Sequence, residues 1–277
     1  MKLVHLSDTH LVAPGNRLYG LDPKERLQDA IAHINAHHAD AEICVLTGDL
    51  VHWGEPQAYE LLAQALERLR VPCVPLLGNH DARGPFRARF PDAPSDGQGF
   101  VQGVRRTTAG TLVFLDTNAD GRHHGRYCAA RQQWLEATLA ATPGELLLFM
   151  HHPPFDIGIS SIDAIGLSDR QAFADIVEPH ARRVRHLFLG HAHRPVCGSW
   201  LGIPYSIVRG TNHQVALDLS PHGEDIPGSH EPPAYAVALI EPDRTVVHLC
   251  EYLDASPRFS LDAHEALGRR YAFEAGF

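Results

Sequence analysis

The 277-residue sequence lacks several features that mark membrane, secreted and disulfide-stabilised proteins. No apolar run reaches membrane-spanning length, and polar residues interrupt the opening MKLVHLSDTH where a signal peptide would have its apolar core. The five cysteines are an odd number without a C-x-x-C pair, and Cys44 and Cys73 lie in apolar runs, as expected of reduced, buried thiols. We therefore expect a cytoplasmic protein.

Positive charge is also scarce. The sequence contains 24 Lys and Arg residues and 33 Asp and Glu residues, which gives a formal net charge of -9. An acidic chain is a poor general binder of nucleic acid or of anionic membranes, so we expect neither as a partner. Histidine, in contrast, occurs 20 times, nearly as often as Lys and Arg together.

Short apolar runs alternate with helical patterns along the first two thirds of the chain. The runs, expected to be strands, are residues 3–6, 43–46, 71–77, 112–115, 146–150 and 184–189. Helical patterns with capping signals occupy residues 22–37, 56–70, 130–140 and 168–177. This alternation indicates an α/β fold, and strands without intervening helices after residue 193 predict that an antiparallel or mixed sheet closes it.

Local sequence signals predict one helix start and two long loops. Ser168 and Gln171 have the spacing of a capping box, which predicts that a helix begins there. Residues 84–99 and 218–234 are rich in Pro, Gly and charge, and we expect them to be long loops.

Polar clusters follow five of the apolar runs: SDTH, TGDL, GNHD, HHPP and GHAH. In open α/β sheets, ligands bind beyond the carboxyl ends of the strands, so these clusters are expected to meet. Residues two apart in an extended chain point to the same side, and Asp8 with His10, and His191 with His193, could each hold one object. The candidate donors are Asp8, His10, Asp49, Asn79, His151 or His152, His191 and His193.

The donor types indicate the kind of ion. A mixture of carboxylate, imidazole and amide suits Zn, Mn, Fe or Co better than Ca or Mg, which prefer oxygen alone. Seven donors exceed one tetrahedral ion, whereas two ions that share Asp49 would use them all. Each cluster alone could equally be a turn or a pair of surface histidines, and only their conjunction favours a metal centre.

The ordered set DTH, GDL, GNHD, HHPP and GHAH, over residues 3–193, resembles the calcineurin-like metallophosphoesterase superfamily. Within it, HLSDTH, GDLVHWGEPQAY and RGTNHQV resemble the class III cyclic-nucleotide phosphodiesterases and the bacterial glycerophosphodiesterases. The resemblance implies a sandwich of two mixed β-sheets flanked by helices, with a dinuclear site at the carboxyl ends of the strands. It also implies a dimer or larger homo-oligomer. The residues after Asp254 have weak helical character, so we expect a catalytic domain over residues 1–254 and a tail over 255–277 that could pack on a partner subunit.

The same resemblance assigns roles to individual residues. One metal would be held by Asp8, His10, Asp49 and His193, and the other by Asp49, Asn79, His151 and His191. The first histidine of HHPP is the ligand in the family, which leaves His152 either behind the ligands or in the pocket. His80 would stand over the substrate as a catalytic residue. Asp81 is a second catalytic candidate, which could orient His80 or a ligand or could simply hold the turn. The substrate pocket would include Asn79, His80, His213, Tyr19 and Asn118.

The implied function is hydrolysis of a small phosphodiester, of the glycerophosphodiester or 3',5'-cyclic nucleotide type. Two divalent transition-metal ions (Fe, Mn, Zn or Co) would activate a bridging hydroxide that attacks phosphorus. Two such ions, the carboxylates of Asp8 and Asp49 and the hydroxide sum to one positive charge, which matches a singly charged diester. The neutral amide of Asn79 preserves that sum. A phosphomonoesterase or nuclease on the same site, or a non-catalytic scaffold, are the alternatives.

Overall fold

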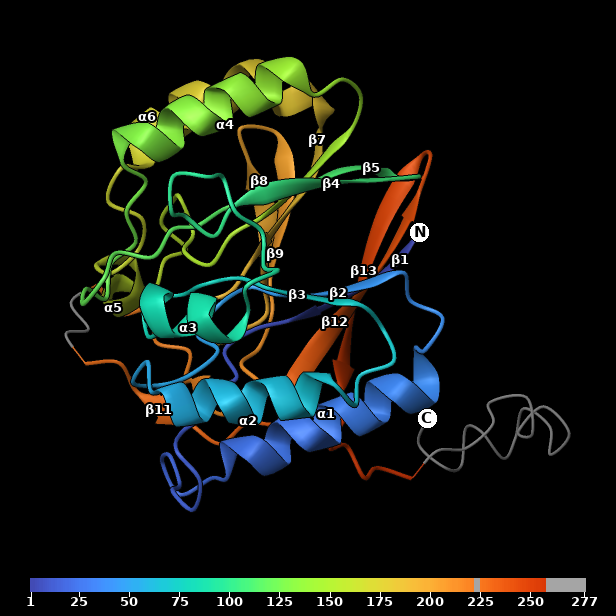
Figure 1. The fold of residues 1–277 in the computed structure, drawn as a ribbon, viewed down its shortest axis with the longest axis vertical. Coiled ribbons are helices and arrows are strands. Elements are labelled where there is room, and N and C mark those ends of the chain that lie inside the picture. Colours follow the sequence, from blue (N-terminus) through green and yellow to red (C-terminus); the bar gives the residue numbers. More distant parts are fainter. Residues whose placement is uncertain (222–224, 258–277) are drawn as a thin grey trace, which may run out of the picture.

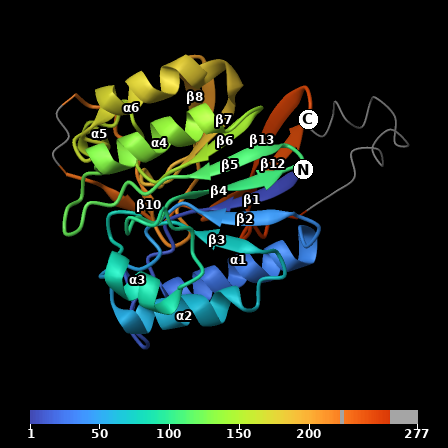
Figure 2. The same ribbon diagram turned by 45° about the horizontal axis from the view of Figure 1, so that its top comes forward.

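The computed structural model describes residues 1–221 and 225–257 (Figures 1 and 2). The expected tail, residues 255–277, lies outside the described residues from 258 onward, and its boundary stays a prediction. Among the described residues, no helix combines the length and the apolar character that a membrane crossing requires.

The first sheet contains five strands in the order β13-β12-β1-β2-β3. Their bounds are β1 Lys2–Leu6, β2 Ile43–Leu46, β3 Cys73–Pro75, β12 Ala234–Glu241 and β13 Arg244–Glu251. Strands β1, β2 and β3 are parallel, with Leu3 opposite Ile43. Strand β12 pairs antiparallel with β1, and β13 pairs antiparallel with β12. The sheet is therefore mixed, as the loss of helices late in the sequence predicts.

The second sheet contains six strands in the order β4-β5-β6-β7-β9-β8. Their bounds are β4 Gly103–Thr107, β5 Gly110–Phe114, β6 Leu146–Phe149, β7 Val184–Leu189, β8 Val196–Trp200 and β9 Ile203–Ile207. The four inner strands are parallel and both edge strands are antiparallel. Two further short strands, β10 Gln214–Val215 and β11 Gly228–Ser229, form a separate ribbon.

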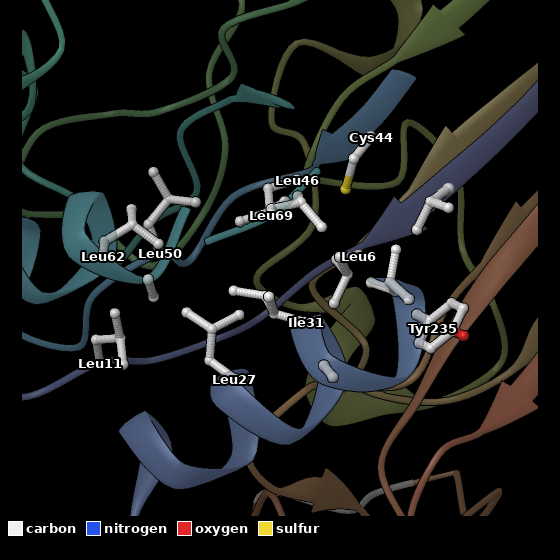
Figure 3. Close-up of a cluster of buried hydrophobic side chains, with 14 of the residues drawn as sticks. Leu6, Leu11, Leu27, Ile31, Cys44, Leu46, Leu50, Leu62, Leu69 and Tyr235 are labelled. Atoms are coloured by element: carbon white, nitrogen blue, oxygen red, sulfur yellow. The ribbon is translucent and has the colours of Figure 1, made fainter. Parts of the chain in front are cut away.

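The two sheets pack face to face, with helices on both outer faces (Figures 1 and 2). The helices are α1 Pro23–His37, α2 Pro56–Leu66, α3 Arg83–Arg89, α4 Ala129–Ala141, α5 Ser160–Asp163 and α6 Arg170–Val177, followed by the 3-10 helix η1 Glu178–Arg183. Figure 3 shows Leu27 and Ile31 of α1 directed toward Leu6 and Leu46 of the first sheet. A second cluster packs under α4 and α6, and a third, which includes Phe149 stacked on Phe188, fills the space between the sheets. The expected two-sheet sandwich is confirmed.

A side-chain cap begins α1, whereas two other expectations about helices are wrong. The carboxylate of Asp22 accepts hydrogen bonds from the first amides of α1, as a helix cap does. In contrast, Ser168 does not cap α6, because its hydroxyl donates to the carbonyl of Gly125 and Asp169 takes the cap position. Part of the expected loop 84–99 is helix α3, because burial of Phe86 outweighs the helix-breaking signals of Gly84 and Pro85.

Candidate metal centre

The predicted donors lie in the loops that follow β1, β2, β3, β6 and β7, at the carboxyl ends of these parallel strands. The loop after β1 runs beside the loop after β2, because the amides of Asp8, His10 and Leu11 donate to successive carbonyls of residues 48–50. The strand ladder thus continues past the strand ends and fixes the two loops relative to each other. The structure brings all seven side chains together.

One half of this cluster, which we call half A, consists of Asp8, His10 and His193. His10 Nε2 lies 3.1 Å from His193 Nε2, and His193 Nε2 lies 3.2 Å from Asp8 Oδ1. Asp49 Oδ2 lies 3.5 Å from His10 Nε2. The ligand atoms of these four residues all fall within 4.8 Å of one another, and all four residues are buried.

The other half, half B, consists of Asn79, His151 and His191. Asn79 Oδ1 lies 3.2 Å from His151 Nε2 and 3.0 Å from His191 Nδ1. His151 Nε2 is also 3.3 Å from Asp49 Oδ2. A single carboxylate oxygen of Asp49 therefore faces a histidine of each half, which is the position that a ligand shared by two ions requires.

Some polar atoms of the cluster are buried without a hydrogen-bond partner, which indicates whether the site suits metal ions. Both carboxylate oxygens of Asp8 are buried and accept no hydrogen bond of good geometry among the described residues, although one of them lies beside His193. An unpaired buried carboxylate is costly unless an ion compensates it, so the donor set and its unpaired atoms fit divalent cations.

Backbone strain is concentrated at the same residues. Among the described residues, only seven besides glycine have a positive φ, and five of them are Asp8, His10, Asp49, His191 and His193. The left-handed conformation costs about 1–2 kcal/mol for such residues and is found mainly at functional sites. The tight turns aim consecutive side chains inward, and sequence spacing alone did not reveal this strain.

Glycines precede the donors in GD, GN and GH for a steric reason. A Cβ on Gly78 would lie 2.3 Å from Asp49 Oδ1, and one on Gly190 would lie 2.1 Å from Ser7 Oγ. The loops approach one another too closely for any side chain at these positions.

Electrostatics keep the carboxylates charged. Burial raises the pKa of Asp49, but the facing charges of His151 and His80 outweigh it and hold the pKa well below its usual value. Burial also lowers the pKa of His151, but the charges of Asp49 and Asp8 and the bond to Asp49 raise it to about 9. For His191, burial lowers the pKa to about 3, which keeps the imidazole neutral and able to bind a metal.

His80 and Asp81 take different places. The amide of His80 donates to Asp49 Oδ1, His80 Nδ1 lies 2.9 Å from the carbonyl of His52, and the half-buried ring lines the pocket. Asp81 is buried and does not line the pocket; its carboxylate accepts from the amides of Leu50, Val51 and Gly78 and from the hydroxyl of Tyr59. Of the roles expected of Asp81, these contacts support that of holding the turn, because they make it a clamp between two donor loops.

His152 and Asn118 also lie behind the donors. Both ring nitrogens of His152 have partners, Thr117 Oγ1 at 2.8 Å and the carbonyl of His123 at 3.3 Å, and the ring packs on His191. The amide of Asn118 donates to the carbonyls of Gly78 and Asp81 and so supports the GNHD turn. Neither residue lines the pocket, although Asn118 was expected there.

A pocket of about 700 Å³ opens over the donors. Tyr19 and His213, both expected there, line it with their rings 4.6 Å apart. Sequence reasoning missed His52, His123 and His230 and the apolar residues Ile162, Ile165, Val215 and Ile226. Those apolar residues come from α5, β10 and the segments beside them, where the sequence holds no motif to signal a site.

Comparisons with known proteins agree with this geometry. Residues 1–195 match the family profile described as calcineurin-like phosphoesterase. A protein of Rhodopseudomonas palustris named "Probable cyclic nucleotide phosphodiesterase" is 49% identical over 97% of this chain and 99% of its own length. A protein of Enterobacter lignolyticus named as a glycerophosphodiester phosphodiesterase is 31% identical over 78% of this chain and 79% of its own.

Solved structures support the fold. The crystal structure of a dimetal phosphatase from Danio rerio superimposes with a TM-score of 0.68 over 91% of this chain and 96% of that chain. The two sequences are 15% identical, so this similarity concerns the architecture alone.

Proposed function

Because this chain belongs to the calcineurin-like phosphoesterase family, we propose that it is a metal-dependent phosphodiesterase that hydrolyses a small phosphodiester. The observation that carries the proposal is the shared position of Asp49 Oδ2 between His10 of half A and His151 of half B. The named phosphodiesterases among its relatives support the same reaction.

The residues that would hold the ions are the seven donors. Asp8, His10 and His193 with Asp49 suit one divalent ion, and Asn79, His151 and His191 with Asp49 suit the other. Such ions would supply an activated water with a pKa of about 7 and would neutralise the phosphoryl oxygens. The donor set is compatible with Fe, Mn, Zn or Co, and cellular supply would decide among them.

His80 is placed to act on the leaving group. Since His80 Nδ1 donates to the carbonyl of His52, Nε2 is the atom left for substrate. A His80 that carries both ring hydrogens can donate from Nε2 to a phosphoryl oxygen or give that proton to the departing alkoxide, a step typically worth about 10²–10⁴-fold.

The pocket lining indicates the charge and size of the substrate. Among the described residues that line it, none is Lys or Arg, so the bound ions and the histidines must balance the substrate's negative charge. This arrangement favours one negative charge over the several of a polynucleotide. Ile162, Ile165, Val215 and Ile226 give the pocket an apolar lining that suits the flat face of a nucleobase, so we expect a 3',5'-cyclic nucleotide to be preferred to a glycerophosphodiester.

A substrate panel tests the proposal. The Mn-loaded protein would be assayed with bis(p-nitrophenyl) phosphate, p-nitrophenyl phosphate, 3',5'-cyclic AMP, glycerophosphocholine and single-stranded DNA. We expect kcat/KM for the diesters to exceed that for the monoester by at least about tenfold, a difference of about 1.4 kcal/mol. Higher kcat/KM for the monoester or for DNA would replace the proposal with one of the alternatives.

Location and assembly belong to the same proposal. We place the reaction in the cytoplasm, in keeping with Cys44 and Cys73, which lie opposite each other on β2 and β3 as free thiols. We expect a homo-oligomer, and light scattering coupled to size-exclusion chromatography measures its mass.

A further inference from the structure

His52 follows the GDL stretch but belongs to none of the donor clusters. Its backbone amide donates to the carbonyl of Leu11, which continues the ladder between the loops after β1 and β2. The ladder places His52 beside His10, and the two Nδ1 atoms lie 3.0 Å apart. The side chain is buried, with about 9% of the residue exposed.

Two imidazole nitrogens at 3.0 Å form a hydrogen bond only if one donates and the other accepts. His10 Nε2 points into the cluster, toward His193 Nε2 and Asp49 Oδ2. A histidine that binds a metal through Nε2 keeps its hydrogen on Nδ1, so His10 must be the donor. His52 Nδ1 is then the acceptor, and the hydrogen of neutral His52 resides on Nε2.

The same residue also contacts His80. The rings of His52 and His80 are stacked, with centroids 4.5 Å apart and planes 18° apart. The carbonyl of His52 accepts from His80 Nδ1. The rings of Trp53 and His52 make a T-shaped contact, with centroids 4.8 Å apart. His52 thus contacts a predicted metal ligand through its ring nitrogen and the predicted proton donor through its ring face and carbonyl.

We infer that His52 is a positioning residue that orients both His10 and His80. The inference rests on the proposed metal site, since the direction of the hydrogen bond follows from a metal on His10. Partners of this kind fix the tautomer and the orientation of a ligating histidine, and their loss typically weakens metal binding about 10–100-fold.

Two substitutions separate the roles of the ring. His52→Phe keeps a flat ring against His80 but removes the acceptor, which leaves the Nδ1 hydrogen of His10 unpaired. His52→Asn places Oδ1 where Nδ1 stood, so the acceptor is kept while the stacking is lost. His248→Phe, at an exposed position of β13, is the matched control.

The primary measurement is the affinity for Mn²⁺, obtained by equilibrium dialysis on each full-length variant after thermal melting shows that it is folded. We expect His52→Phe to raise the dissociation constant of one ion about 10–100-fold, and His52→Asn to restore it to within about threefold of the original protein. With metal saturating, His52→Asn should lower kcat more than it changes KM, because His80 has lost its stacking partner.

Three outcomes would overturn the inference. His52→Phe could bind both ions as tightly as the original protein does. His52→Asn could lose one ion as completely as His52→Phe, which would make the imidazole itself a ligand, as the proximity of His10, His52 and His80 also permits. His248→Phe could weaken binding as much as His52→Phe. If the original protein binds no divalent ion, the proposed function fails instead, so the two failures are distinguishable.

Discussion

The two halves of the donor cluster differ in what holds one histidine of each, His10 in half A and His151 in half B. In half A, His10 is held by the side chain of His52. In half B, His151 Nδ1 lies 2.7 Å from the carbonyl of Thr47, a backbone group that no substitution removes. The halves differ in charge as well, since half A adds the carboxylate of Asp8 where half B adds the neutral amide of Asn79.

The two halves also differ in the backbone conformation of their residues. Two of the three residues of half B have ordinary φ values and all three of half A have positive φ. Half A therefore has more strained turns, and its His10 depends on a side chain. His193 of half A, like His151 of half B, bonds a backbone carbonyl through Nδ1, that of His213. We expect substitutions around half A to change metal affinity and substitutions around half B to change substrate charge preference or stability.

Removal of the residue common to both halves should have the largest effect. Asp49→Ala deletes the oxygen that faces His10 and His151, so both ions should be lost and turnover should fall by more than about 10³-fold. Metal content measured by mass spectrometry beside the rate constant checks this. A variant that keeps both ions would show that the halves do not share Asp49.

His80→Ala should have the second largest effect. Because the His80 side chain supplies no donor to either half, both ions should remain bound while kcat falls about 10²–10⁴-fold. The Asp49 carboxylate keeps its bond from the backbone amide of residue 80, which the substitution retains. Loss of metal in this variant would contradict the assignment of His80 to the substrate.

Strand and helix patterns predicted the α/β class and the meeting of the donor loops, because the order of the strands determines which ends coincide. The two-sheet sandwich was implied by the family resemblance alone. The sequence could not predict β4 or α3, whose residues bury few side chains or contain helix breakers, so that tertiary packing decides their conformation. Nor could it decide among the roles considered for Asp81, the last residue of GNHD. The bonds by which Asp81 supports the turn depend on where the amides of Leu50 and Val51 lie.

The pocket also combines residues that the sequence predicts with residues that only the fold brings together. The donors are visible in sequence because their residue types and spacing follow from metal chemistry. The isoleucines that line the pocket come from segments that the fold alone brings together. The role inferred for His52 depends on the 3.0 Å contact between its Nδ1 and that of His10, which joins two loops.

Asn79→Asp should have a smaller effect that tests the charge difference between the halves. A carboxylate at this position should keep or tighten metal binding at half B, since the ligand atom stays beside His151 and His191. It also adds one negative charge to the site, so KM for an anionic diester should rise about tenfold. Unchanged substrate affinity in the metal-loaded variant would rule out charge as the reason for the amide.

Thr47→Val should have the smallest effect on metal and isolates the backbone support of half B. The substitution leaves the carbonyl that His151 bonds, but it removes the hydroxyl that pairs with His5 Nε2 and Ser7 Oγ. We expect Mn²⁺ affinity within about twofold of the original protein and a loss of about 1–3 kcal/mol in unfolding free energy, from buried groups left unpaired. Equilibrium dialysis and urea unfolding measure the two quantities. If Thr47→Val weakened metal binding as much as His52→Phe, support by backbone and support by side chain would not distinguish the halves.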